Sequence, residues 1–339
     1  SYPGGSSSVN VFDYSGTGSF HKVNRNSRQQ PYIDIEHLHT YNNTKLLSFD
    51  GSSHNVIIGS GSTWDAIIGN AVGSNQKYTL SAWIHPTQLD HAGGNDFPRI
   101  FDFSGQDIAF LIRHNGRLQF DQVFTGNRGR WITAINTIQT NRWYHVAVTY
   151  DATSIANDPV FYVNGEVVAI ANEEETPAGS NAGIGSTTCL IGNASGLVRD
   201  FKGFMDDTSV WNDVLTATEI KEIYNYSSSS TNYVYRETPG PSDLNTHSAV
   251  SKLVSWWRTD DNTGNTALPD SIGSNNGILA ATAMVINNDG SSVEELESTI
   301  IYQEQTDKKH DNFFVQHQIP QTDLQYAWIT ASIIENYTG

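Results

Sequence analysis

The sequence contains a single cysteine and neither a signal peptide nor an initiator methionine. Cys189 is the only cysteine among 339 residues, so the chain can form no intrachain disulfide. This argues against a typical secreted animal domain but is compatible with a viral or bacterial surface protein that assembles in the cytosol. The missing leader and the first residue, Ser1, indicate a processed protein or a fragment of a longer chain.

Long apolar runs and basic residues are also scarce. No stretch of about 18 consecutive apolar residues occurs, so we expect no membrane insertion. Charged residues make up 16% of the chain, and 36 Asp and Glu against 19 Lys and Arg give a net charge of −17. A surface this acidic repels nucleic acid and anionic lipid, which argues against both classes of partner.

Aromatic residues and short apolar segments separated by polar turns are abundant. The chain has 8 Trp, 15 Tyr and 14 Phe. Residues 78–84 and 143–150 are typical of strands, and the first of them alternates apolar with small or polar side chains. Asn115-Gly116 and Asn164-Gly165 each separate two such segments, as in hairpins with a two-residue turn. The pattern predicts an all-β fold, a two-sheet antiparallel sandwich.

One short helix is predicted late in this region. Thr216 is a suitable N-cap, and Glu219 three residues later completes a capping box. We expect this helix to cap one open end of the sandwich.

Composition divides the chain into four parts. Residues 1–45 are Gly/Ser-rich and then polar, which predicts an extended arm or linker. Residues 46–226 hold the strands of the sandwich. Residues 227–250 form a Ser/Pro/Gly linker. Residues 251–339 are a β-rich C-terminal segment with too few strands for a closed sandwich, so we expect it to add to the first sheet or to form part of a second unit.

Four segments resemble, in the same order, the laminin-G-like and pentraxin domains, which are concanavalin A-like jelly rolls. The most informative is FMDDTSVWNDVLTATEIKEIY, which follows Gly203. The other three are residues 78–86, 142–151 and 160–168. The resemblance implies a jelly-roll sandwich with Trp83, Trp143 and Trp211 in the core between the two sheets.

Shorter resemblances concern the source of the chain. The region from Trp256 to Gly277 is similar to the opening of another laminin-G-like unit. Residues 312–330 and the phrases FHKVNRNSR and LVSWWR resemble segments of structural proteins from marine phages and related environmental viruses. This resemblance implies a virion or extracellular surface location, and a homo-oligomer or a place in a larger assembly.

Residue patterns for catalysis are missing. Glycoside hydrolases of this fold resemble Glu-x-Asp-x-x-Glu on one strand, and this spacing does not occur. The sequence also has no nucleophile elbow and no phosphate-binding Gly-rich loop. We interpret Glu173-Glu174-Glu175 as solvated carboxylates in a turn-like stretch, and His37 and His39 as surface residues of the arm. We therefore predict that the protein is not an enzyme.

A ligand-binding site is predicted in a Gly-rich loop. Asn127, Arg128 and Arg130 would supply polar groups beside Trp131, whose ring would form an exposed aromatic platform for a sugar. Burial of Trp131 in the core is the alternative interpretation.

Calcium is the cofactor to which the resemblance points. The pentraxin pair of ions needs two acidic loops, but residues 191–196 contain no carboxylate, so we expect no such pair. One structural calcium ion could bind at Asp50 or Asp206. Otherwise Asp206 and Asp207 would be turn carboxylates that accept backbone hydrogen bonds.

Three hypotheses for function remain open. The leading one is a non-enzymatic structural or attachment module of a virus particle that binds surface glycans or other virion proteins. The second is a lectin-like carbohydrate-binding domain of a bacterial or eukaryotic surface protein. The third is a polysaccharide-active enzyme.

Overall fold

The computed structural model describes residues 8–12, 20–24, 45–89, 97–225, 244–262, 264–287, 301–302 and 315–316. The chain divides into two units. In one unit, β1 (Ser8–Phe12) pairs with β2 (Phe20–Asn24), and β20 (Ile301–Tyr302) pairs with β21 (Val315–Gln316). The other unit spans residues 43–233 and 237–288 and holds the remaining described helices and strands.

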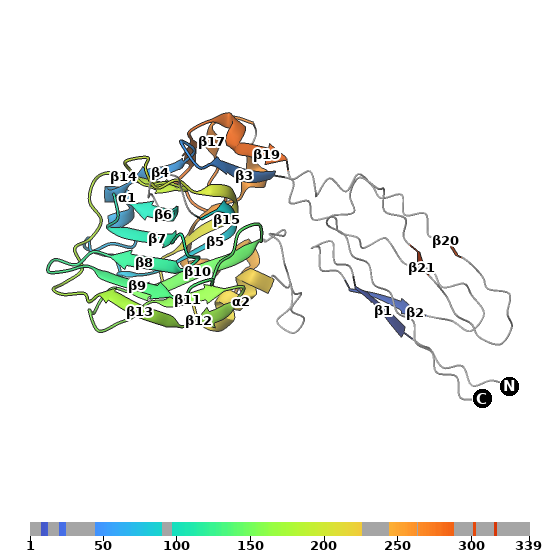
Figure 1. The fold of residues 1–339 in the computed structure, drawn as a ribbon, viewed down its shortest axis with the longest axis horizontal. Helices are drawn as coiled ribbons and strands as arrows, with labels where there is room; N and C mark the ends of the chain where they lie inside the picture. The colour runs from blue at the N-terminus through green and yellow to red at the C-terminus, as the bar shows by residue number, and fades with distance from the viewer. Residues whose placement is uncertain are drawn as a thin grey trace. The chain divides into compact units, whose positions relative to one another are not determined.

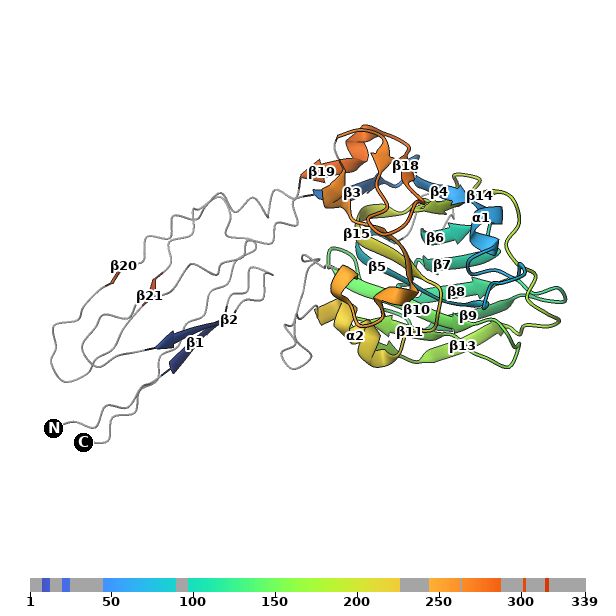
Figure 2. The ribbon, with the colours of Figure 1, turned by 180° about the vertical axis from the view of Figure 1, so that it is seen from behind.

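Two antiparallel sheets form the larger unit, as Figures 1 and 2 show from opposite sides. One sheet has eight strands. Its order is β12 (Glu166–Val168), β11 (Val160–Val163), β10 (Tyr144–Asp151), β5 (Lys77–Gln88), β15 (Lys202–Trp211), β3 (Lys45–Asp50) and β19 (Val285–Asn287), with β16 (Leu253–Trp257) also paired to β15.

The second sheet has nine strands. Its order is β13 (Ile170–Glu175), β9 (Gly129–Thr133), β8 (Leu118–Gln122), β7 (Ile108–Ile112), β6 (Arg99–Phe103), β14 (Thr188–Ile191), β4 (Val56–Ser60), β18 (Gly277–Leu279) and β17 (Ala267–Leu268). The prediction of an all-β, two-sheet antiparallel jelly-roll sandwich is confirmed.

One of the two predicted two-residue hairpin turns is present, whereas Asn115 and Gly116 lie in a longer loop, because Ile112 pairs with Leu118. Asn164 and Gly165 join β11 to β12 with φ angles of 50° and 77°. These left-handed values are those of a type I′ turn, which matches the twist of the two strands. Asn115 and Gly116 lie between β7 and β8, and Gly116 has a φ of 72°.

The core between the sheets follows strand alternation. In β5, Tyr78, Leu80, Ala82 and Ile84 point inward and are fully buried. The intervening residues point to the outer face of the sheet, because successive side chains of a strand alternate. The tryptophans of the core are Trp64, Trp131 and Trp257.

The expected positions of three other tryptophans are corrected by this alternation. Trp83 is buried, but on the outer face of the eight-stranded sheet, where its ring packs 5.6 Å from Tyr224. Trp211 is buried in a separate cluster with Leu215 and Ile220. Trp143 is only half-buried. For Trp83 and Trp211 the physical reason is that a covered outer face gives a strand the same apolar pattern as the core.

The predicted helix is α2 (Ala217–Asn225), but it packs on the outer face of the eight-stranded sheet, with Tyr224 against Trp83, which corrects the expectation that it caps an open end of the sandwich. Its capping box is formed in both directions. The backbone N–H of Glu219 donates to Thr216 Oγ1 at 3.2 Å, and the N–H of Thr216 donates to Glu219 Oε2 at 2.7 Å. A second short helix, α1 (Gly61–Asp65), places Trp64 in the core. None of the helices in the described ranges is long and apolar enough to cross a bilayer.

Replacing Thr216 with valine should lower the free energy of unfolding by about 1 kcal/mol, because the side-chain acceptor of the cap is lost. Urea denaturation measures this change. Thr216→Ser is the matched control, because it keeps a hydroxyl at the same position. Equal stability of the valine and serine variants would contradict the role of the cap.

Strands from residues 253–287 lie in both sheets of the sandwich. β16 pairs with β15, and β19 pairs with β3. β18 pairs with β4 in the other sheet, and β17 extends it. Four 3-10 turns complete the fold: Leu244–Thr246, Val250–Lys252, Thr259–Asp261 and Thr282–Met284. Most of the predicted arm, including His37 and His39, and most of the predicted linker lie outside the described residues.

Candidate functional site

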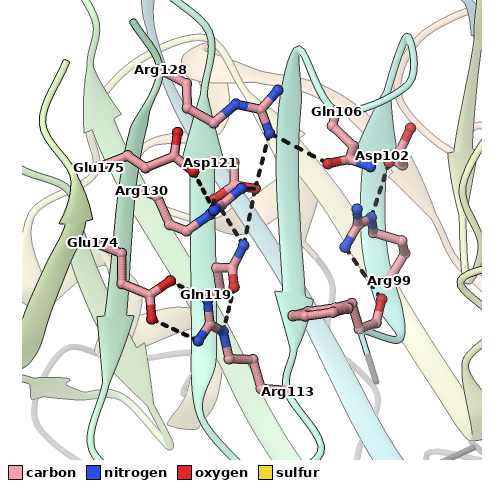
Figure 3. Close-up of polar contacts among 11 residues, drawn as sticks. Arg99, Asp102, Gln106, Arg113, Gln119, Asp121, Arg128, Arg130, Glu174 and Glu175 are labelled. Carbon is pink, nitrogen blue, oxygen red and sulfur yellow. Dashed lines mark hydrogen bonds and ion pairs between the residues drawn. The ribbon is translucent and has the colours of Figure 1, made fainter. Parts of the chain in front are cut away.

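The outer face of the nine-stranded sheet carries a layer of charged and amide side chains (Figure 3). In β8, Leu118 and Phe120 point into the core, so Gln119 and Asp121 point outward. Even so, Gln119 is 3% exposed and Asp121 is 1% exposed, because longer side chains lie over them. We call this set the polar layer: Arg99, Asp102, Arg113, Gln119, Asp121, Arg128, Arg130, Glu174 and Glu175.

Asp121 is the centre of the polar layer. Its Oδ1 accepts hydrogen bonds from Arg130 Nε at 3.0 Å and from Gln119 Nε2 at 2.9 Å. Arg128 forms a looser ion pair with Oδ2, at 3.7 Å. Asp121 therefore holds three longer side chains in fixed positions above the sheet.

Two ion pairs connect the polar layer to the edge strand β13. Arg130 also pairs with Glu175, and Arg113 binds both carboxylate oxygens of Glu174 in a fork. The hydrogen bond from Arg113 lowers the pKa of Glu174. Burial acts to lower the pKa of Arg130, but its pairs with Asp121 and Glu175 outweigh burial and raise that pKa. Glu174 and Arg130 therefore stay ionised at neutral pH.

Arg99 and Asp102 form a deeper ion pair on β6. The distance from Arg99 Nε to Asp102 Oδ2 is 3.0 Å, and the two side chains are 3% and 0% exposed. Burial raises the pKa of Asp102, although Arg99 and the N–H of Gly105 oppose that shift. This pair is closed to solvent.

The loop after β6 adds a further amide. Ser104, Gly105 and Gln106 have successive φ angles of 53°, 72° and 83°, all left-handed. This backbone places Gln106 so that its side-chain oxygen Oε1 accepts a hydrogen bond from Arg128 Nη1 at 3.4 Å. Residues other than glycine seldom adopt left-handed φ angles, so the backbone conformation of Ser104 and Gln106 is energetically unfavourable.

Phe97 supplies an aromatic ring beside the polar layer. The guanidinium of Arg113 lies 5.6 Å from its ring centroid, and that of Arg199 lies 5.0 Å away. The backbone carbonyl of Phe97 accepts a hydrogen bond from Arg99 at 3.2 Å. Phe97 is half-buried.

The four residues predicted as a ligand site are placed differently. Arg128 and Arg130 belong to the polar layer. Asn127 is exposed, and its side chain donates to the carbonyl of Thr176 at 2.8 Å. Trp131 is fully buried in the core, which corrects the expectation of an exposed platform. It follows Arg130 on β9, so it must point to the opposite face.

Sequence reasoning missed most of the polar layer. Glu174 and Glu175 are ion-paired on β13, which corrects their interpretation as solvated turn residues. The available signal was the strand LQFDQ, where Gln119 and Asp121 alternate with core residues. Their arginine partners could not be identified without knowing which strands pair.

Asp50, one of the two candidate metal ligands, already accepts hydrogen bonds from the protein backbone. Asp50 Oδ1 accepts backbone N–H groups of Ser52, Ser53 and His54 at 2.9, 2.9 and 3.0 Å. Burial acts to raise its pKa, but these hydrogen bonds outweigh it and lower the pKa to about 2. Asp206 is 3% exposed on β15.

A calcium ion needs about six to eight oxygen ligands. Within the described residues no group of three or more His, Cys, Asp or Glu side chains could hold a metal ion. An ion at Asp50 or Asp206 would have to draw most of its ligands from backbone carbonyls and water. The single calcium ion stays a prediction. The prediction that no pentraxin-like pair of calcium ions binds also stays a prediction, because residues 90–96 lie outside the described residues.

Comparison with known families gives one match over half of the chain. Residues 50–221 match the model of the concanavalin A-like lectin/glucanases superfamily. No curated protein sequence matches the chain.

Solved structures of similar fold include two bacterial proteins and one from an arthropod. A candidate carbohydrate binding protein from Bacteroides ovatus ATCC 8483 shares 18% identity with a TM-score of 0.46, over 79% of this chain and 66% of its own. This chain therefore spans just under two thirds of that protein. A heptameric SAP-like pentraxin from Limulus polyphemus shares 17% identity with a TM-score of 0.38, over 59% and 90%. The CBM40 domain of a Ruminococcus gnavus sialidase, bound to α2,3-sialyllactose, shares 13% with a TM-score of 0.39, over 54% and 99%.

Proposed function

The chain belongs to the concanavalin A-like lectin/glucanases superfamily, and from that premise we propose that it binds carbohydrate on the polar layer of the nine-stranded sheet. The observation that carries the proposal is the layer itself. Four guanidinium groups and four carboxylates are held by mutual ion pairs on neighbouring strands and loops. Sites built on strands keep such groups in register for a ligand.

Five outer side chains of the polar layer are partly exposed, so a ligand in solution can contact them. The side chains of Arg113, Glu174, Arg128, Arg130 and Glu175 are 16–33% exposed, whereas Asp121 is 1% exposed. Adjacent sugar hydroxyls both donate and accept hydrogen bonds, so a guanidinium beside a carboxylate suits them. The half-buried Phe97 ring would contact the apolar face of a sugar.

The same groups do not favour hydrolysis. A glycosidase needs a carboxylic acid whose raised pKa lets it donate a proton to the leaving group. Arg113 lowers the pKa of Glu174. The pKa of Asp102 is raised, but this carboxyl is 0% exposed and paired with Arg99. The proposed activity is therefore binding without catalysis.

The family match supports the lectin-like interpretation better than the virus-particle one. Location on a virion or an extracellular surface, and assembly into an oligomer, stay predictions. Sedimentation of the full chain would test its assembly.

A glycan array probed with the full chain tests the proposal. Arg113→Gln/Glu174→Gln removes one reachable ion pair without changing the net charge. We expect this double variant to bind the glycans recognised by the parent at least about tenfold more weakly, because charged hydrogen bonds are lost. Incubation with those glycans should release no reducing ends.

Glu166→Gln/Lys221→Gln is the matched control, because it removes an exposed ion pair between β12 and α2. This control should bind as the parent does. An array without any bound glycan, or equal loss in both double variants, would contradict the proposal.

A further inference from the structure

The helix α2 seals a histidine against the outer face of the eight-stranded sheet. His145 of β10 lies directly opposite Trp83 of β5, and both rings point outward because Val146 and Ala82 are in the core. The ring of Tyr224, on α2, lies 5.6 Å from that of Trp83 and 6.0 Å from that of His145. Both views place α2 beside β10 and β11 (Figures 1 and 2), and His145 is 0% exposed.

Apolar packing holds α2 on the sheet. Ile220 and Ile223 of the helix share a buried cluster with Ala147 and Tyr162 of the sheet. The helix also lies close to the hairpin turn, because a carbon atom added to Gly165 would come within 3.0 Å of a ring carbon of α2. If the helix moved away, an apolar part of the sheet would be open to solvent.

Two polar atoms under α2 oppose this packing. They are Trp83 Nε1 and His145 Nδ1, which are buried without a hydrogen-bond partner in the part of the chain that the structure describes. The other ring nitrogen of His145 is 2.8 Å from Ser81 Oγ. A buried polar atom without a partner costs free energy that contact with water returns. Opening of the helix would therefore satisfy both atoms.

The groups that face the His145 ring are uncharged at neutral pH. The neighbouring strand β5 brings Ser81 and Trp83, and α2 brings Tyr224. Asn164, in the hairpin turn, binds only backbone atoms of His145. Burial alone lowers the pKa of His145. A positive charge on this ring would be buried without a counter-ion, which is strongly unfavourable.

The charged groups closest to this interface do not supply that counter-ion. Lys221 of α2 forms an ion pair with Glu166 of β12. Asp206 of β15 lies opposite Trp83, so β5 separates its carboxylate from His145.

A second histidine contacts α2 in a different environment. His247 Nε2 lies 2.9 Å from the carbonyl oxygen of Glu219 and 3.7 Å from the carboxylate of Glu222. Its Nδ1 accepts the N–H of Ala249, a bond that does not involve α2. A positive charge on His247 would have a counter-ion, so acid should act on the helix through His145.

We propose that α2 is an acid-released cover, and that protonation of His145 opens the helix and exposes the apolar outer face of the eight-stranded sheet. The ring can bind a proton only when the helix is open, so acid stabilises the open state. With an ordinary pKa of about 6.5 in that state, the equilibrium constant for opening rises about 30-fold from about pH 7.5 to about pH 5. This inference does not rest on the function proposed for the polar layer, which lies on the other sheet.

Amide hydrogen exchange of the full chain tests the inference, read on peptides of α2 and of β7 and β8 at about pH 7.5 and about pH 5. After correction for the intrinsic exchange rate, we expect the protection of α2 to fall about 30-fold at the lower pH. At both pH values it should be lower than that of β7 and β8 and depend little on dilute urea, because local opening exposes little surface.

Two variants assign the effect to one histidine. His145→Gln cannot titrate, so the protection of α2 should be the same at both pH values. His247→Gln is the matched control, because it removes the other histidine in contact with α2, and its protection should fall as in the parent. His145→Phe keeps an aromatic ring against Trp83 and Tyr224 and repeats the test if the glutamine variant does not fold.

Three results would overturn the inference. The first is protection of α2 that stays constant between the two pH values in the parent. The second is a fall of the same size in the variant that lacks His145. The third is protection of α2 equal to that of β7 and β8 with the same dependence on urea, because the helix would then open only when the whole sandwich unfolds.

Discussion

Replacing Trp257 with alanine should lower the free energy of unfolding by about 3–5 kcal/mol, the range measured for large aromatic truncations in cores. Trp257 is fully buried between the sheets, with its ring 6.0 Å from that of Trp64. Its Nε1 donates to the carbonyl of Asn275 at 2.8 Å. The alanine variant would leave a cavity and an unpaired carbonyl together.

This measurement also tests whether residues 253–287 complete the core of residues 46–226. Urea denaturation of the full chain gives the free energy. Trp143→Ala is the matched control, because it removes the same side chain from a half-buried position. We expect the control to lose much less stability. A loss below about 1 kcal/mol for Trp257→Ala would mean that the C-terminal strands contribute little to the core.

Acidification from about pH 7.5 to about pH 5 should lower the free energy of unfolding by about 2 kcal/mol through His145 alone. His145 is 0% exposed and packs between Trp83 and Tyr224. Its Nε2 is 2.8 Å from Ser81 Oγ, and its Nδ1 has no hydrogen-bond partner among the described residues. Burial disfavours the imidazolium and lowers the pKa of His145 to about 3.

The direction of this effect follows from the two pKa values. In the unfolded chain His145 has an ordinary pKa of about 6.5, so below that pH the unfolded state binds more protons than the folded state. The contribution to stability is complete above pH of about 6.5 and is lost as the pH falls toward about 3. Aspartates with lowered pKa, such as Asp50, lose theirs only in stronger acid.

Urea denaturation at several pH values between about 7.5 and 5 measures the slope. His145→Gln keeps a polar group near Ser81 and cannot titrate, so it should remove most of the slope. The pKa of His85 is also lowered by burial, so His85→Gln is the control for a half-buried histidine and should remove less. A slope that survives in His145→Gln would contradict the assignment.

Local patterns in the sequence were enough to predict one two-residue hairpin turn and the helix. Asn164-Gly165 and the Thr216–Glu219 capping box depend on residues within a few positions of each other, and the structure forms both. Four ordered segments also resembled one family, which covers residues 50–221.

Long-range pairing could not be predicted in the same way. β18 and β19 have only three residues each, and they join strands more than 200 positions earlier in the chain. Alternation shows that Trp83 and Ile84 face opposite sides, but it does not show which side is the core when both are covered. The partners of Asp121 and Arg130 depend on strands β8, β9 and β13 being neighbours.

The pairing of β3 with β19 has a mechanical consequence. Lys45, at the start of β3, lies opposite Asn287, at the end of β19, and the ladder continues through Leu46–Ile286 and Leu47–Val285. Tension applied through the two flanking segments would therefore enter the sandwich at one point. Hydrogen bonds loaded from one end break in turn rather than together, and this ladder is short. Under load the eight-stranded sheet should begin to unzip at β19 before tension reaches the strands that hold the polar layer.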